Sequence, residues 1–117
     1  MIEFTLPIKT VNESNGSHGH WRAKSARRQG HRTAVWAQMH GKVLPELPVT
    51  VTVTRISAGE LDEHDNLRGA LKAVVDQIAE HYGVADKDRR FTWQYAQEKA
   101  MRGTYGVRIK IESSEAT

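Results

Sequence analysis

The chain has 117 residues, of which 17 are Lys or Arg, 14 are Asp or Glu and none is Cys. This length is enough for one modest hydrophobic core and too short for two, so we expect a single domain over residues 1–117. The lack of cysteine excludes disulfides and thiolate metal sites. No apolar run approaches the roughly 20 residues of a membrane span, so we expect a cytoplasmic protein with no membrane contact.

The net charge of +3 conceals a segregation of charge along the chain. Residues 1–59 carry eight Lys or Arg and three acids, a balance of +5, whereas residues 60–117 carry nine against eleven, a balance of −2. One part of the chain can therefore attract a polyanion while another gathers acidic groups for a metal ion. A nuclease needs this division of charge.

The first predicted elements are a strand and a helix. Ile2 to Leu6 has the pattern of a short strand, which Pro7 ends. A helix is predicted over residues 25–40, with Ser25 as its N-cap and Gly41 just after its last residue. Its expected inward contacts are Ala26, Ala34, Ala37 and either Trp36 or Met39.

One side of this predicted helix is basic. Its members fall at helical spacing and are Lys24, Arg27, Arg28, His31 and Arg32. Together with Arg22, this side predicts contact with phosphates, and the alternative is an ordinary solvated helix face. Trp21 and Trp36 are able to stack on unpaired bases of a nucleic acid, although packing in a core or a dimer interface is the commoner role.

The clearest strand leads into the most acidic segment. Valine and threonine alternate strictly over residues 49–54, so a strand is predicted from Val49 through Ile56. Four carboxylates then crowd into residues 60–65, where only Leu61 and His64 separate them. Like charges this close are costly unless a cation neutralises them, and Mg²⁺ takes oxygen ligands. The alternative is an acidic surface loop in which Asp65 caps the next helix.

The second helix is predicted over residues 66–82, because eight apolar residues from Leu67 to Tyr82 recur at helical spacing, and Gly83 ends it. Two alternating strands follow, around Phe91–Tyr95 and Tyr105–Ile111, and the short connection 100–103 predicts an antiparallel hairpin. The predicted fold is α/β (α+β) in the order β-α-β-α-β-β, with two helices packed on a mixed or antiparallel sheet.

A family resemblance joins these features. It rests on an ordered set: Leu6-Pro7, the basic half, the strand, Glu63-His64-Asp65-Asn66-Leu67 and, one helix later, Gly83-Val84-Ala85-Asp86-Lys87-Asp88. In this set the chain resembles the RusA family of Holliday junction resolvases, often carried by phages and prophages. The resemblance implies a homodimer that binds four-way DNA junctions and cuts them with Mg²⁺ or Mn²⁺, through clustered carboxylates aided by a lysine and without a small-molecule cofactor.

The resemblance implies metal ligands in the acidic segments. Asp65 takes the second aspartate of the motif. The first falls on Glu63, with Asp62 as a substitute. The aspartate pair after the helix leaves two choices, of which we favour Asp88 and keep Asp86 as a close alternative.

The lysine that the resemblance implies has moved. The family places it four residues after Asp65, where this chain has Gly69. Lys72 lies one helical turn further on and is followed by Asp76, so it is the expected replacement. The alternative for Lys72 is a surface pair with Asp76.

The resulting hypothesis is a metal-dependent endodeoxyribonuclease that resolves branched DNA. Its expected catalytic residues are Asp65, Lys72 and Asp88, and its expected metal ligands are Asp62, Glu63, Asp65, Asp86 and Asp88. The expected DNA contacts come from Arg22, Lys24, Arg27, Arg28 and Arg32. One alternative is a branched-DNA-binding module of the same fold that has lost cleavage. Another is a structural protein that dimerises through its acidic and basic surfaces.

Overall fold

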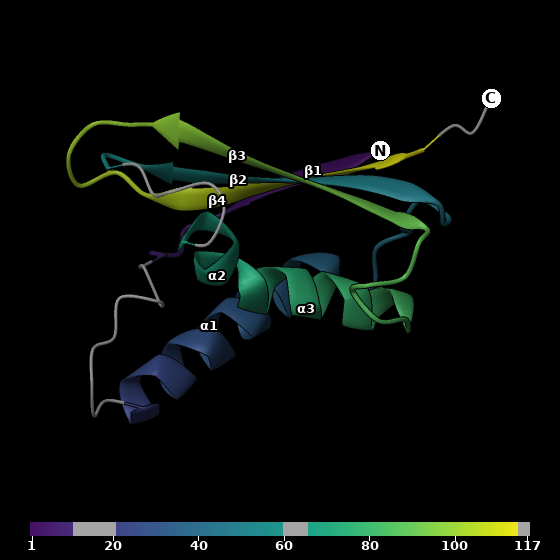
Figure 1. Cartoon of the computed structure of the whole chain (residues 1–117), viewed down its shortest axis with the longest axis horizontal. Coiled ribbons are helices and arrows are strands. Elements are labelled where there is room, and N and C mark those ends of the chain that lie inside the picture. The colour runs from purple at the N-terminus through teal and green to yellow at the C-terminus, as the bar shows by residue number, and fades with distance from the viewer. Residues whose placement is uncertain (11–20, 60–65, 115–117) are drawn as a thin grey trace.

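The computed structural model describes residues 1–10, 21–59 and 66–114. The elements in chain order are β1 (Ile2–Leu6), α1 (Trp21–Met39), β2 (Val49–Ser57), α2 (Arg68–Ala70), α3 (Lys72–Tyr82), β3 (Phe91–Lys99) and β4 (Gly106–Ser113). The strands form one mixed four-stranded sheet, and the helices lie against one of its faces (Figure 1). The predicted fold class is confirmed.

The sheet order is β1-β4-β2-β3, so the predicted hairpin is wrong. β2 pairs with β4 on one side, antiparallel, and with β3 on the other, parallel. β3 and β4 therefore have β2 between them, and the segment that joins them crosses its end (Figure 1). β2 is an inner strand, and its inward valines are fully buried.

The core lies between the sheet and the helices. Val49, Val51 and Val53 of β2 are 0% exposed, and the threonines between them point to the other face. Ile109 of β4 is opposite Phe4 in β1 and Val53 in β2. These side chains pack against the apolar side of α3. The alternating apolar residues of the strands and the helically spaced apolar residues of α3 therefore form a single core.

The second predicted helix is interrupted. A turn at Leu71 separates α2 from α3, since Leu71 has φ −103° and ψ 2°, outside the helical range. The apolar side is nevertheless continuous, because Leu67, Leu71 and Ile78 are all buried. Gly83 ends α3 in the left-handed region, with φ 71°, as predicted.

α1 differs from its prediction in its start and its inward side. It begins at Trp21, so Ser25 lies within the helix and is not its N-cap. The buried residues are His31, Val35 and Met39, whereas Ala26 and Ala37 are exposed. His31 therefore leaves the predicted basic side: its Nε2 lies 3.0 Å from the carbonyl oxygen of Lys9.

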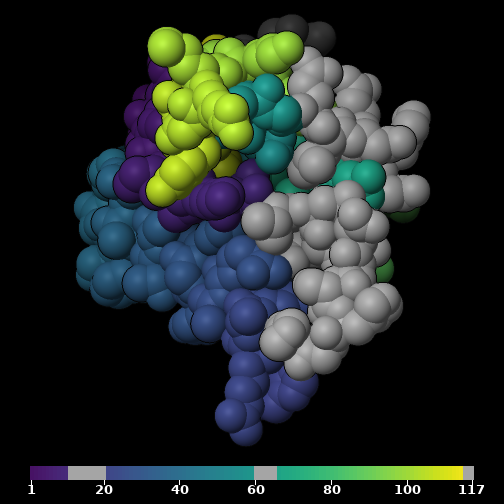
Figure 2. Space-filling view, turned by 90° about the vertical axis from the view of Figure 1, so that its left-hand side faces the viewer, coloured from purple at the N-terminus to yellow at the C-terminus, as the bar shows by residue number. Residues whose placement is uncertain are grey.

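The first turns of α1 project from the body of the molecule (Figure 2). Most of their side chains are exposed, which fits the high content of charged and small residues there. Within the ranges that the structure describes, no helix has both the length and the apolar character needed to cross a membrane.

Candidate functional site

Lys72 joins two carboxylates from different elements. Its Nζ donates a hydrogen bond to Asp86 Oδ2 at 2.7 Å and lies 2.9 Å from Asp76 Oδ1. Asp76 is one turn further along α3, whereas Asp86 belongs to the turn after that helix. The alternative of a surface pair with Asp76 thus holds only in part, because the same ammonium also reaches an aspartate 14 residues away.

β3 positions the Asp86 backbone. The indole Nε1 of Trp93 donates to the carbonyl oxygen of Asp86 at 2.9 Å. Trp93 is partly buried and packs against the core, with its ring 4.8 Å from that of Phe91. The turn at Gly83 brings the chain back from α3 to this strand. A partly buried aromatic and a left-handed glycine therefore hold Asp86 beside Lys72.

The charges at this site perturb one another in the expected directions. Hydrogen bonds to Asp86 and then to Asp76 raise the pKa of Lys72, and burial acts weakly against them. The hydrogen bond from Lys72 holds the pKa of the Asp86 carboxyl below its ordinary value of 3.8. Both groups are therefore charged at neutral pH, and the site contains a fixed ion triad.

Tyr95 and Arg68 border the triad. The guanidinium of Arg68 lies 5.2 Å from the centre of the Tyr95 ring, within the range of a cation–π contact. Burial raises the pKa of the Tyr95 hydroxyl, while the positive charges of Arg68 and Lys72 lower it. Tyr95 is therefore close enough to sense the charges around Lys72.

Asp88 has a different partner from Asp86. Its carboxylate accepts hydrogen bonds from the backbone and side chain of Arg90, at 2.9 Å from N and 2.9–3.0 Å from the guanidinium. The side-chain bond from Arg90 is the main reason that the pKa of Asp88 falls to about 2. The two aspartates of the predicted pair thus have different ion-pair partners: Asp86 is bonded to Lys72 and Asp88 to Arg90.

Two of the predicted DNA-binding residues reach the same site. A cavity of about 340 Å³ between α1 and α3 is lined by Arg28, Arg32, Lys72, Ala73 and Asp76. Arg32 also forms an ion pair of 3.0 Å with Glu80 of α3, which fixes it across the two helices. We call it the cationic cavity, because its walls carry three positive side chains and one carboxylate.

The other predicted DNA-binding residues lie on the first turns of α1. Arg22 sits 5.6 Å from the ring of its neighbour Trp21, and Arg22 is exposed. Lys24 and Arg27 are partly buried on the same turns. These three residues therefore follow the helix away from the cationic cavity.

The remaining predicted ligands lie outside the described residues. They are Asp62, Glu63 and Asp65, and His64 is in the same segment; the description resumes at Asn66, just before α2. Among the residues that the structure does describe, no group of three or more His, Asp or Glu side chains is placed to hold a metal ion. The described part of the site supplies only Asp76 and Asp86 as carboxylates near Lys72.

Arg55 is a site residue that sequence reasoning missed. It is 7% exposed, on the inward side of β2 where Val49, Val51 and Val53 precede it. Its Nε donates to Thr10 Oγ1 at 2.8 Å and its guanidinium NH1 to the carbonyl oxygen of Gly59 at 2.6 Å. Burial lowers the pKa of Arg55.

The sequence contained a signal for this residue, because Arg55 follows three valines on the same side of the strand and a charged residue is rarely buried there without a partner. Thr10 and Gly59 are the last described residues before the segments 11–20 and 60–65. A single buried cation is therefore bonded to the last described residue before each of these segments.

No protein-family model matches the chain, and no curated protein matches it either.

Proposed function

We propose that the protein is a Mg²⁺-dependent endodeoxyribonuclease that cuts four-way DNA junctions. The observation that carries the proposal is the Lys72 triad. Lys72 begins α3 and Asp86 follows the end of that helix, and their 2.7 Å contact brings together two of the residues expected at such a site. Arg28 and Arg32 line a cavity with the same lysine, so cations that suit phosphates adjoin the carboxylates.

Two carboxylates beside Lys72 support the proposed metal site. Asp76 and Asp86 already gather around one cation, the Lys72 ammonium, and Mg²⁺ is usually held by one or two carboxylates together with water and phosphate. Asp86 would hold it with Asp65 and with Asp62 or Glu63. A metal ion bound there would polarise the scissile phosphate and lower the pKa of a water molecule.

Lys72 has a further donor for the substrate. An ammonium group has three N–H donors, and Asp76 and Asp86 engage two of them. The third is available for a phosphate oxygen in the cationic cavity, where Arg28 and Arg32 provide further positive charge. In this role Lys72 orients the carboxylates and stabilises the negative charge that develops on the phosphate in the transition state.

A homodimer is part of the same proposal. A four-way junction has two equivalent strands to cut, and an isologous dimer places two sites about a twofold axis. Sedimentation analysis of the purified protein tests this part. A mass of one chain, both alone and on the junction, would contradict it.

The direct test uses a labelled four-way junction and a linear duplex of the same sequence, each incubated with Mg²⁺ and with EDTA. Paired nicks on the junction alone, and only with Mg²⁺, support the nuclease. Binding of the junction without nicks supports the cleavage-deficient module. No binding at low salt contradicts both, because phosphate contacts are strongest there.

Single carboxylate variants then locate the chemistry. Asp65→Asn and Asp86→Asn should abolish nicking and leave junction binding intact, because each removes a proposed ligand without enlarging a side chain. Glu112→Gln is the matched control, since this exposed carboxylate is engaged with Lys110 at 3.6 Å on β4. Asp88→Asn separates the two aspartates: nicking by this variant assigns the ligand to Asp86, and loss of nicking assigns it to Asp88.

A further inference from the structure

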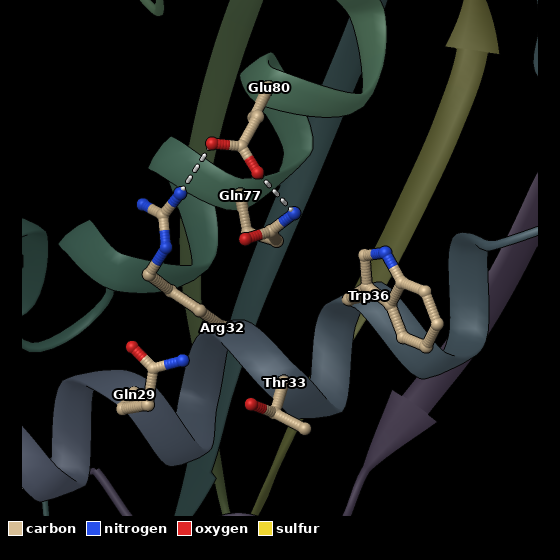
Figure 3. Close-up of a pocket in the computed structure, with 6 residues that line it drawn as sticks. All are labelled: Gln29, Arg32, Thr33, Trp36, Gln77 and Glu80. Atoms are coloured by element: carbon tan, nitrogen blue, oxygen red, sulfur yellow. Dashed lines mark hydrogen bonds and ion pairs between the residues drawn. The ribbon is translucent and has the colours of Figure 1, made fainter.

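A second cavity lies beside the cationic cavity, between α1 and α3. Its volume is about 390 Å³, within the range of small-ligand sites, and Figure 3 shows the residues around it. One wall comes from α1 and the other from α3, and the lining residues are Gln29, Arg32, Thr33, Trp36, Gln77 and Glu80. We call it the Trp36 pocket.

The aromatic wall is half exposed. Trp36 keeps 48% of its surface accessible, although large aromatic side chains on a helix normally pack into the core. Its ring is stacked on that of His40, with centroids 4.4 Å apart and planes inclined by 20°. The stack holds the indole plane in place, so Trp36 offers a preset flat surface at one end of the pocket (Figure 3).

The other wall is polar, with Gln77 buried and Glu80 exposed. Gln77 is 5% exposed, and its amide nitrogen donates to Glu80 Oε2 at 3.1 Å. Glu80 also accepts from Arg32 at 3.0 Å, so its charge is compensated within the wall (Figure 3). Gln29 and Thr33 add further hydrogen-bonding groups from α1. A flat ring with hydrogen-bonding groups along its edge suits this combination of walls.

The two cavities are continuous in their lining. Arg32 lines both of them, and the cationic cavity adds Arg28 and Lys72. Lys72 and Gln77 are little more than one turn of α3 apart, a rise of about 7.5 Å. A ring in the Trp36 pocket would therefore have cations for an attached phosphate next to it.

We propose that the Trp36 pocket receives one unpaired nucleobase of single-stranded or branched DNA, stacked on Trp36, with the adjoining phosphate against Arg28 and Arg32. Bases within a duplex have both faces covered, so only an unpaired base presents a face for stacking together with its hydrogen-bonding edge. This inference rests on the proposed function, because it names the part of a branched substrate that the protein recognises apart from the cut.

The test measures binding without cleavage. Fluorescently labelled oligothymidylate and a duplex of equal length are titrated with protein in EDTA, and the dissociation constants are followed over a series of salt concentrations. Trp36→Ala should weaken oligothymidylate binding by roughly 5- to 100-fold, the loss expected for one stacked base. Duplex affinity should stay unchanged. Trp36→Phe should recover most of the loss, because a ring is retained.

Matched variants separate stacking from charge and from folding. Tyr105→Ala removes another exposed aromatic ring, 49% accessible and outside the pocket, and should leave oligothymidylate affinity unchanged. Arg28→Gln should reduce the slope of log affinity against log salt by about one unit, whereas Trp36→Ala should not change that slope. Circular dichroism and urea midpoints establish that each variant is folded.

Three results would overturn the inference. The first is an equal loss in Trp36→Ala and Tyr105→Ala, and the second is an equal loss for oligothymidylate and duplex. The third is a change of sedimentation mass in Trp36→Ala, which would assign the pocket to a second copy of the chain. Junction nicking with Mg²⁺ is scored separately, so a protein that stacks bases but never nicks contradicts only the proposed nuclease, and one that nicks without the Trp36 effect contradicts only this inference.

Discussion

Replacing Lys72 by methionine should destabilise the protein by about 0.4–2 kcal/mol at neutral pH. Each exposed ion pair contributes roughly 0.2–1 kcal/mol, and Lys72 makes two, with side-chain exposures of 54% for Lys72, 36% for Asp76 and 29% for Asp86. The repulsion between the two carboxylates is present with and without the ammonium, so it adds nothing to this difference.

The pH dependence gives the prediction its sign. The folded-state pKa of Asp86 is lowered, so the stability from this pair is fully present above the ordinary pKa of 3.8 and is lost as the pH falls through the folded value. The folded-state pKa of Lys72 is raised, so the same stability is lost at alkaline pH as the pH rises through a value above 10.5. The difference between wild type and Lys72→Met should therefore be greatest between these limits.

The assay is a double-mutant cycle by urea unfolding. Lys72→Met, Asp86→Asn and the double variant are compared with wild type at neutral pH and at successively lower pH. Lys99→Met, which removes an exposed cation at the end of β3, is the control and should change stability by no more than about 0.5 kcal/mol. A coupling energy between Lys72 and Asp86 within about 0.3 kcal/mol of zero at neutral pH would refute the reasoning, as would a coupling that persists unchanged in acid.

Three other predictions concern the scaffold and the neighbouring turn. Gly30→Ala should stabilise the protein by about 0.5–1 kcal/mol, because a Cβ there meets nothing within 4 Å. Gly83→Ala should destabilise it by about 1 kcal/mol, because the backbone there has a φ of 71°. Urea midpoints of the two variants that move in the same direction would contradict this contrast. Carboxyl NMR should find Asp88 titrating near 2, with the stability from its bond to Arg90 lost as the pH falls through that value, and Arg90→Gln should return its pKa toward 3.8. Ile109→Ala, at a fully buried position, should cost roughly 2–5 kcal/mol in urea unfolding, and a cost below about 1 kcal/mol would show that the strand is not central.

The helices and strands were predicted more accurately from the sequence than the pairing of the strands in the sheet. The strict Val-Thr alternation of β2 and the apolar spacing from Leu67 to Ile78 are local patterns; β2 forms where it was expected, and the predicted helix forms with a break at Leu71. The hairpin was wrong because nearness in sequence favoured pairing the last two strands, whereas both of them pair with β2. Pairing order is a property of the whole core, which no local pattern contains.

The candidate site was predictable in part for the same reason. Helical spacing placed Lys72 beside Asp76, but the choice between Asp86 and Asp88 depended on a hydrogen bond from Trp93 and on the local attraction of Arg90. In α1, charge counts predicted a basic side that included His31, but the packing of Val35 and Met39 turned that histidine inward. The hydrogen bond from Arg55 to Thr10 joins residues 45 positions apart, which no spacing rule reaches.

The inner position of β4 has a consequence for how the sheet is held together. β4, residues 106–113, follows β1, β2 and β3 in the chain, yet it lies between β1 and β2 and pairs with both. Among the strands that the structure describes, β1 pairs with β4 alone. Cleavage of the chain before residue 106 and loss of β4 would therefore leave β1 without its partner strand and one edge of β2 open, while the β2–β3 pair would remain.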